Sequence, residues 1–306
     1  MMLDDASQQP AIGPARPVVS DRSGRVEILT QVCTDDLLSA FGLGELRYGR
    51  YLLELISRIP VRRLARQVAT YDEIVGESGL AAGGAWALER MVRHVEVEGL
   101  EKVPRDGPLL LAANHPGLSD AIVLFATTPR ADLRVLAAER PFLNALPNTL
   151  RHLLTVPEQP QGRFRLVRTA TRHLRGGGTV LTFPGGKIEP DPAVLPGAIE
   201  TLDRWSASVD LFARLVPDLV VVPVIVSGVI SPTALRNPLT FLRRRKEDRE
   251  WLAATIQMMM PALRNVTTRI AFGRPVRTDD SADRSVSRTT LGEARRLIEQ
   301  GGAGQC

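Results

Sequence analysis

Cysteine, histidine, lysine and long apolar runs are all scarce in this chain of 306 residues. The two cysteines, Cys33 and Cys306, match no metal-ligand spacing, so we expect no bound metal and a reducing compartment. No apolar run reaches the length of about 18 residues that a transmembrane helix needs. Residues 1–25 lack a basic start followed by an apolar core, so we expect no signal peptide. If the protein works on membranes, we expect it to lie on their surface.

Aromatic residues make up only 5% of the chain, and no base-stacking motif is evident. Nucleic acid is therefore not expected as a partner, although the net charge is +5 and the isoelectric point is near 9.7. The positive charge is almost all arginine, since Lys102, Lys187 and Lys246 are the only lysines. Because arginine grips phosphate through a bidentate fork, the basic surface suits anionic lipid or a phosphorylated substrate.

Composition divides the chain into four regions. Residues 1–28 are polar and rich in proline and serine, which indicates a disordered tail. We expect an N-terminal helical region over residues 29–94, an α/β domain over residues 95–290, and a C-terminal helix and tail over residues 291–306. In the helical region, Thr34 is predicted to start a helix and Pro60 to end the next one.

The pattern after residue 95 alternates apolar runs with helical segments. It predicts an α/β fold with a mainly parallel sheet flanked by helices. Because proline has no N–H, Pro223 predicts that its strand lies at an edge of the sheet or is locally irregular. The expected strands are 95–99, 109–113, 133–138, 179–183, 219–227 and 268–272, and helices are expected at 120–127 and 163–175.

The segment Asn114–Asp120 is the main candidate for a catalytic site. It follows the apolar run Leu109–Ala113, and open α/β sheets place their chemistry at the C-terminal ends of strands. His115 can take a proton near neutral pH, and Asp120 can fix the tautomer of its ring. A His–Asp pair at this spacing is also common in surface loops, so the neighbouring motifs decide between the two interpretations.

A glycine-containing loop follows another expected strand. Phe183 runs into Pro184-Gly185-Gly186-Lys187-Ile188-Glu189-Pro190. Two glycines let backbone N–H groups approach an anion closely, and Lys187 adds a point charge. A tight turn that holds no ligand is the alternative interpretation.

These motifs, taken in chain order with Val221-Val222-Pro223-Val224, resemble the glycerolipid acyltransferase family, which includes lysophosphatidate and glycerophosphate acyltransferases. The resemblance extends from residue 95 to residue 275. It implies transfer of a fatty acyl group from acyl-CoA or acyl carrier protein to a lipid hydroxyl, with His115 as general base and Asp120 orienting it. It implies no cofactor beyond the acyl donor, and lysophosphatidate or a related lysophospholipid as acceptor. The substrate-binding residues that it implies are Asn114, Pro116, Ser119, Arg140, Phe183, Pro184, Gly185, Gly186, Lys187, Glu189 and Pro223.

The glycine loop departs from the family pattern. Gly185 stands where glutamate is usual, and Ile188 stands where an arginine is usual. The loop also resembles the Pro-Gly-Gly-x-x-Glu loop of diacylglycerol and phytyl-ester acyltransferases, which make neutral lipids. A neutral-lipid or wax-ester acyltransferase, or an inactive lipid-binding relative, therefore stays open as an alternative. No arginine matches the family's second block. Arg151 and Arg163 are the candidates to replace it, and Arg140 is another possible phosphate contact.

Two surface features suggest contact with a membrane. The expected helix around Tyr48–Arg58 mixes tyrosine, leucine and arginine, as an interfacial helix does, and packing on the core is the alternative. The run Arg243–Lys246 suits an anionic membrane, and pairing with the acidic residues that follow it is the alternative. From these features and the resemblance we expect a peripheral protein on the cytoplasmic face of the membrane.

Overall fold

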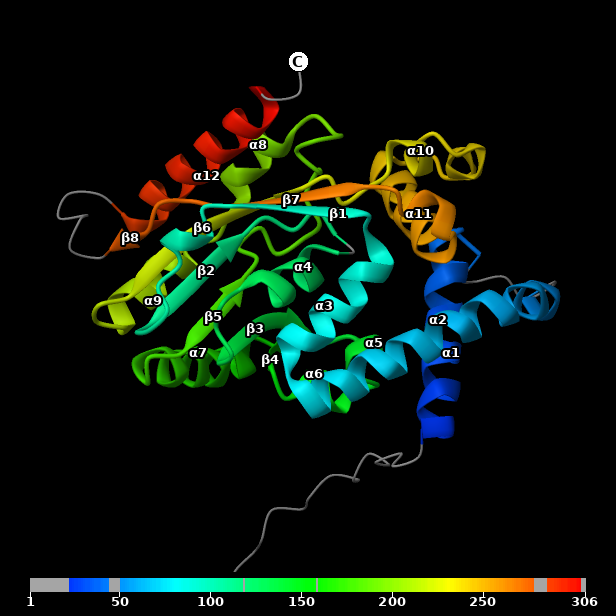
Figure 1. Cartoon of the computed structure of the whole chain (residues 1–306), viewed down its shortest axis with the longest axis horizontal. Coiled ribbons are helices and arrows are strands. Elements are labelled where there is room, and N and C mark those ends of the chain that lie inside the picture. Colours follow the sequence, from blue (N-terminus) through cyan, green and yellow to red (C-terminus); the bar gives the residue numbers. More distant parts are fainter. Residues whose placement is uncertain (1–21, 44–49, 118, 158, 278–284, 304–306) are drawn as a thin grey trace, which may run out of the picture.

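The computed structural model describes residues 22–43, 50–117, 119–157, 159–277 and 285–303 (Figure 1). Tyr48 and Gly49, at the start of the helix expected around Tyr48–Arg58, lie outside these ranges. The strands are β1 (His94–Glu98), β2 (Leu109–Ala113), β3 (Leu133–Ala138), β4 (Leu153–Val156), β5 (Thr179–Thr182), β6 (Val220–Ser227), β7 (Thr267–Phe272) and β8 (Val276–Arg277). The α-helices are α1 (Arg22–Ala40), α2 (Arg50–Ser78), α3 (Leu80–Met91), α4 (Asp120–Thr127), α5 (Pro141–Asn144), α6 (Pro147–Leu150), α7 (Pro160–Arg175), α8 (Ala198–Thr201), α9 (Ser208–Leu215), α10 (Pro232–Leu235), α11 (Lys246–Met259) and α12 (Val286–Ala303). Short 3-10 helices are η1 (Leu100–Lys102), η2 (Leu202–Arg204), η3 (Pro238–Leu242) and η4 (Pro261–Leu263).

The strands form one sheet in the order β1-β7-β6-β2-β5-β3-β4, with β8 beside β6. The strands from β6 to β4 are parallel to one another, whereas β7 runs antiparallel to β6 and β1 runs parallel to β7. The predicted fold class, a mainly parallel sheet flanked by helices with an N-terminal helical region, is confirmed.

Strand β2 lies in the middle of the sheet and divides the core into two layers. Leu109 and Leu111 belong to the cluster shared with α3 and α4, and Leu110 belongs to the cluster shared with α7, α9 and α12. Successive side chains of a strand point to opposite faces, so a strand that is apolar at every position must be covered on both sides. The layers fix the C-terminal end of β2, where the candidate site begins.

The N-terminal helices differ from the prediction at two points. Helix α1 begins at Arg22, before the predicted boundary at residue 29, and Thr34 lies inside it. The Thr34 hydroxyl donates to the carbonyl of Thr30 at 2.7 Å, a bond to the preceding turn that replaces the predicted capping role. Pro60 lies inside α2 and does not end it. Its missing N–H frees the carbonyl of Ile56, and this turn is exposed to solvent that can satisfy it.

A small third core ties α1 to the region after β6. Ala40 at the end of α1 packs with Ala234 of α10 and with Leu252 and Ile256 of α11. The N-terminal helices are thereby held against residues some two hundred positions away in sequence.

Pro223 lies in a central strand, so the prediction of an edge position is wrong. The alternative, local irregularity, is what the structure shows. In β6, the backbone groups of alternate residues point toward opposite neighbouring strands. Those of Pro223 point toward β7, where its carbonyl accepts the N–H of Gly273 at 2.8 Å. Residues 273–275 separate β7 from β8, so the proline stands at the break between two antiparallel partners.

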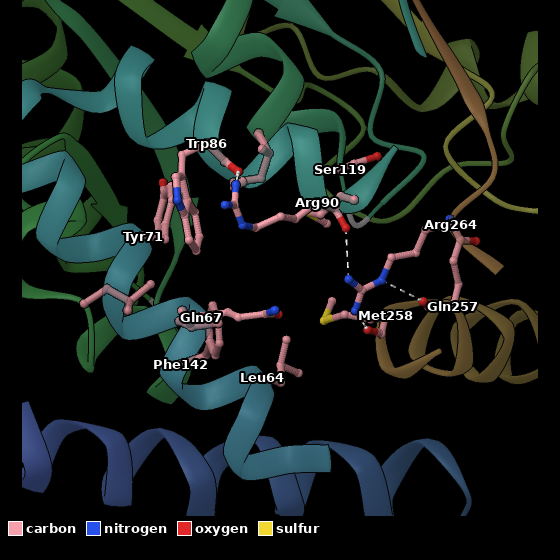
Figure 2. A pocket seen from close by; sticks show the side chains of 15 residues that line it. Leu64, Gln67, Tyr71, Trp86, Arg90, Ser119, Phe142, Gln257, Met258 and Arg264 are labelled. Carbon is pink, nitrogen blue, oxygen red and sulfur yellow. Dashed lines mark hydrogen bonds between the residues drawn. The ribbon is translucent and has the colours of Figure 1, made fainter. Parts of the chain in front are cut away.

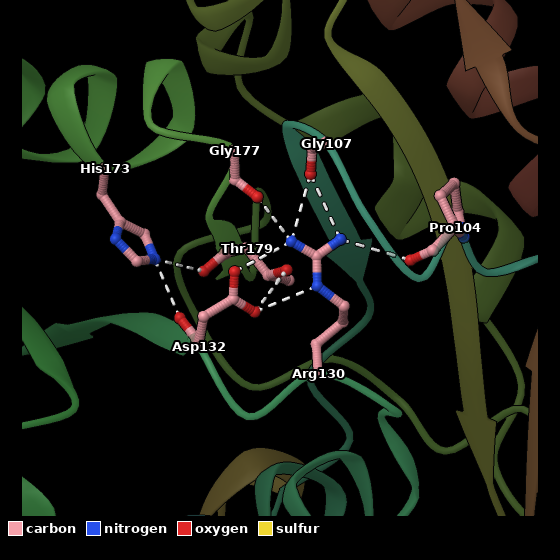
Figure 3. Close-up of polar contacts among 7 residues, drawn as sticks. All are labelled: Pro104, Gly107, Arg130, Asp132, His173, Gly177 and Thr179. Atoms are coloured by element: carbon pink, nitrogen blue, oxygen red, sulfur yellow. Dashed lines mark hydrogen bonds and ion pairs between the residues drawn. The ribbon is translucent and has the colours of Figure 1, made fainter.

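A single arginine connects the loops at the N-terminal ends of the parallel strands (Figure 3). The Arg130 guanidinium donates to the carbonyls of Pro104, Gly107 and Gly177 and to both carboxylate oxygens of Asp132. Arg130 is buried, and the loops before β2, β3 and β5 meet on its one planar group.

The C-terminal helix α12 begins at Val286, earlier than the predicted residue 291, and packs on β6 and β8. Within the part of the chain that the structure describes, no helix has the length and apolar character needed to cross a membrane.

Candidate active site

Neighbouring parallel strands bring the two sequence motifs together. Strands β2 and β5 are paired in register from Leu109 with Thr179 to Ala112 with Thr182. The loop from Asn114 and the loop from Phe183 therefore leave the same edge of the sheet side by side, at the C-terminal strand ends.

His115 and Asp120 are in direct contact, as their spacing predicts. The His115 Nδ1 lies 2.6 Å from the Asp120 Oδ2, and Asp120 is buried while the His115 side chain is 33% exposed. The same Asp120 oxygen accepts the N–H of Gly117 at 2.8 Å, and the other accepts the N–H of Ala121. Since the carboxylate occupies Nδ1, the neutral ring has Nε2 free to accept a proton.

The surroundings of His115 favour its protonated form. Burial alone lowers the pKa of His115, but the hydrogen bond and charge of Asp120 and the charge of Glu189 together raise it above its ordinary value. The Phe183 ring lies 4.5 Å from the imidazole, centroid to centroid, and limits its movement. The arrangement suits a general base that must hold a proton briefly and return it.

Glu189 joins the two loops. Its Oε2 accepts the backbone N–H of His115 at 2.8 Å, and its own N–H donates to the His115 carbonyl at 2.8 Å. Its Oε1 accepts the indole N–H of Trp205 at 2.9 Å. Burial raises the pKa of Glu189, although its hydrogen bonds and the charge of His115 oppose the rise. Glu189, which the sequence predicts to bind substrate, is hydrogen-bonded to the backbone of the candidate base.

Asn114 is likewise committed to the protein. Its Oδ1 accepts the N–H of Val226 at 2.7 Å, and its Nδ2 donates to the carbonyl of the same residue at 2.9 Å. The amide thus extends the pairing of β2 with β6 by one step beyond the backbone ladder. These contacts make Asn114 a support for the site, although the sequence predicts that it binds substrate.

The glycine loop has one inward and one outward part. A Cβ at Gly185 would lie 3.0 Å from the carboxyl carbon of Glu189, so glycine makes room for that carboxylate. Gly186 turns the chain with a φ of +66°, a conformation that favours glycine. Lys187 and Ile188 are exposed, and the Ile188 side chain lies beside Gly117. The exposed Lys187 directly precedes this contact, and its role as a phosphate contact stays a prediction.

Asp191 is a buried residue that the sequence analysis missed. It accepts the N–H groups of Ala193, Gly228, Val229 and Ile230, although burial raises its pKa overall. It fastens the glycine loop to the end of β6. An aspartate between two prolines signals only a local turn, so its long-range partners could not be predicted.

An apolar cavity of about 180 Å³ adjoins the His115 loop (Figure 2). It is far larger than the roughly 10–15 Å³ that one water molecule needs. Ser119, next to Asp120, lies on one side, and Trp86 and Phe142 lie on the other. The Ser119 hydroxyl is buried and has no hydrogen-bond partner among the described residues. The rest of the wall comes from α2, α3, α4 and α11: Leu64, Gln67, Val68, Tyr71, Ala87, Arg90, Met91, Ile122, Gln257 and Met258, with Leu146 and Arg264 from adjoining segments.

The other predicted residues have varied positions. Pro116 and Pro184 are buried in the two loops. Arg140 is exposed and its charge acts on Asp36 of α1, so it belongs to the contact between α1 and α5. Pro223 lies against Gly273, on the side of β7 away from β2.

Two features of the described residues bear on metal binding and on thiol chemistry. The described residues contain no group of three or more His, Cys, Asp and Glu side chains that could hold a metal ion. Cys33 is buried in α1, and burial raises its pKa to about 12, so it remains a thiol at neutral pH.

Two comparisons with known proteins give a match. Residues 94–227 match the family described as Acyltransferase. The crystal structure of the 1-acyl-sn-glycerophosphate (LPA) acyltransferase PlsC from Thermotoga maritima has a similar course, with 18% sequence identity, a TM-score of 0.44, and coverage of 92% of this chain and 98% of that one. No curated protein matches the sequence.

Proposed function

We propose that the chain, whose residues 94–227 match the acyltransferase family, moves a fatty acyl group from an acyl-thioester to a hydroxyl of a glycerolipid. The donor is acyl-CoA or acyl carrier protein, and the acceptor is lysophosphatidate or a related lysophospholipid. The observation that carries this proposal is the His115–Asp120 pair at the strand ends, beside an apolar cavity.

In the proposed reaction, the free Nε2 of His115 takes the proton of the acceptor hydroxyl. The oxygen attacks the thioester carbonyl carbon, and a tetrahedral intermediate forms. When the carbon–sulfur bond breaks, the imidazolium returns its proton to the leaving thiolate, and the products are an ester and a free thiol. Asp120 stabilises the imidazolium and holds the tautomer. The only cysteine in the described ranges is buried and protonated, which supports direct transfer without an acyl-enzyme.

The two substrates meet from different sides in this proposal. The acyl chain occupies the cavity behind Ser119, whose apolar wall matches a hydrocarbon chain. Lys187 attracts the phosphate of the acceptor from the outer part of the glycine loop. A peripheral position on the cytoplasmic face of a membrane completes the proposal, since the lysophospholipid acceptor resides in a bilayer.

One observation favours a second candidate, a neutral-lipid acyltransferase. An exposed isoleucine, Ile188, lies where the family pattern has arginine, and it leaves Lys187 as the only cation of the glycine loop. An acceptor without a phosphate, such as monoacylglycerol or a fatty alcohol, needs no further cation in this loop.

Release of free thiol from long-chain acyl-CoA tests the function. The acceptor panel is lysophosphatidate, glycerol 3-phosphate, monoacylglycerol, a fatty alcohol and none, and acyl carrier protein replaces CoA in a second series. His115→Ala should abolish acceptor-dependent release, whereas His94→Ala, an exposed histidine on β1, should match the wild type. Equal release by His115→Ala would remove His115 as the base; release with neutral acceptors alone would favour the second candidate.

A further inference from the structure

An apolar and basic patch lies outside the site, between α10 and α11. Leu239, Phe241 and Leu242 of η3 are exposed, Phe241 by 66% and Leu242 by 64%. Arg244 and Arg245 follow directly and are also exposed. We refer to these five residues as the η3 patch. Large apolar side chains exposed side by side mark a surface that meets something other than water.

The η3 patch is held in shape from within. The buried Thr240 hydroxyl donates to the carbonyl of Asn237 at 2.7 Å, and the Asn237 side chain accepts the N–H of Leu239 at 3.0 Å. The Arg249 guanidinium lies 5.3 Å from the centroid of the Phe241 ring. Since the turn is fixed while its apolar side chains point outward, their exposure is built into the fold.

The basic residues next to the patch differ in whether they form an ion pair. Arg243 pairs with Asp248 at 2.8 Å, and Lys246 lies 3.9 Å from Glu250. Arg244 and Arg245 form no ion pair with any residue in the described ranges. Two cations are therefore free to meet anionic groups just beyond the apolar side chains.

The first half of α2 presents a similar surface nearby. Leu55, Ile56 and Ile59 are exposed, Ile59 by 82%, and Arg58 lies among them. Figure 1 shows the start of α2 and the segment between α10 and α11 at the same end of the molecule. The Arg243 side chain, next to the patch, lies against Gly42, which follows the end of α1.

We propose that the η3 patch is a second membrane contact, which places Leu239, Phe241 and Leu242 in the boundary between headgroups and acyl chains. Arg244 and Arg245 bind the anionic headgroups above them. With the exposed face of α2, the patch makes a two-point contact that fixes how the enzyme lies on the bilayer. An acidic protein partner would suit the arginines but would leave three large apolar side chains unexplained, so the bilayer is the better match. The inference rests on the proposed function, because a lipid acceptor resides in a bilayer.

Vesicle sedimentation with the full chain tests the patch without any turnover. Vesicles of phosphatidylcholine alone are compared with vesicles of phosphatidylcholine and phosphatidylglycerol at 3:1. Phe241→Ser with Leu242→Ser should weaken binding to both by about tenfold. Arg244→Gln with Arg245→Gln should weaken binding to the anionic vesicles by about tenfold or more and leave the neutral ones nearly unchanged.

Matched controls remove the same chemistry elsewhere. Leu211→Ser deletes an exposed leucine on α9, and Arg288→Gln with Arg295→Gln deletes two exposed arginines on α12, both far from α10 in Figure 1. Both should bind vesicles as the wild type does. Unchanged binding by the Phe241/Leu242 variant would overturn the inference, as would equal losses in the controls.

A soluble assay separates this inference from the proposed function. With short-chain acyl-CoA and a monomeric short-chain acceptor, the Phe241/Leu242 variant should turn over at the wild-type rate. A wild type that binds anionic vesicles through the patch but transfers no acyl group would refute the function and keep the contact. A variant that loses only its rate with acyl carrier protein, at unchanged vesicle binding, would refute the contact and assign the patch to that protein.

Discussion

At the scale of single residues, two carboxylates act on His115 in different ways. Asp120 holds the imidazole ring, and Glu189 holds the backbone of the same residue from the other loop. The proposed base is therefore held through both its ring and its backbone before any substrate arrives, which is the preorganisation that proton transfer at a set geometry requires.

Asp120→Asn should change the pH dependence as well as the rate. The charge and hydrogen bond of Asp120 raise the pKa of His115, so the variant's pKa falls and the acid limb of kcat/KM moves to lower pH. The plateau should fall at least about tenfold, because the imidazolium loses its counter-charge. A thiol-release assay across pH measures both, and an acid limb that stays in place would contradict the assignment.

The raised pKa of His115 also makes the stability of the folded protein depend on pH. A raised pKa means that protonation favours the folded state; this contribution is complete below the unfolded value of about 6.5 and is lost as the pH rises through the folded value. Asp120→Asn should remove the part of the low-pH stability that depends on this pair.

Lys187→Ala should act on substrate affinity alone. Loss of its exposed charge should raise KM for lysophosphatidate by about threefold to tenfold and leave KM for monoacylglycerol unchanged, because only the first acceptor carries a phosphate. Arg288→Ala, which removes an exposed charge from α12, is the control. Equal effects on both acceptors would exclude a phosphate contact.

At the scale of elements, the cavity is built between the N-terminal helices and the α/β core. Helices α2 and α3 supply one wall, and Ser119 with α4 supplies the wall next to the His115 loop. The N-terminal region therefore contributes directly to the space that we assign to the acyl chain.

Ala87→Phe should shorten the preferred acyl chain. Ala87 lines the cavity, whereas Ala85 on the same helix is exposed and does not. A ring at position 87 fills volume that a long chain needs, so kcat/KM for a long-chain donor relative to a short-chain one should fall about tenfold. Ala85→Phe should leave the ratio unchanged, and an unchanged ratio in both variants would place the chain elsewhere.

The sequence predicts elements best where one pattern is strong. Strands β2 and β3 and helix α4 have the predicted bounds, because apolar runs and a nearby turn define them locally. Pro60 and Thr34 misled the prediction, since tertiary packing carries a helix through positions that an isolated helix disfavours. The His115–Asp120 contact follows from spacing, but the bonds of Glu189 to His115 and of Asp191 to the end of β6 join distant segments that no local pattern encodes.

At the scale of the whole molecule, the parallel strands separate two tasks. Their C-terminal ends carry the candidate site, and their N-terminal ends meet on Arg130. The effect of a substitution at one edge of the sheet can therefore be distinguished from the effect of a substitution at the other.

Arg130→Ala should lower stability and spare catalysis. It leaves three carbonyls and the Asp132 carboxylate without their donor, so the free energy of unfolding should fall by about 3–5 kcal/mol. Urea unfolding measures the loss, and kcat of the folded fraction should stay within about twofold of the wild type. Arg130→Lys keeps the charge but not the planar fork and should be intermediate. A stable but inactive Arg130→Ala would contradict this division.

The place of β1 in the sheet has a consequence for synthesis on the ribosome. This strand, at residues 94–98, pairs with β7 at residues 267–272, and α1 packs on α10 and α11. The first third of the chain therefore cannot complete these contacts until the last third has left the ribosome. Until then β1 is unpaired and the end of α1 lacks its cover, the condition in which nascent chains aggregate or bind chaperones. A chain that stops before Thr267 leaves β1 without its neighbour and the antiparallel side of β6 open.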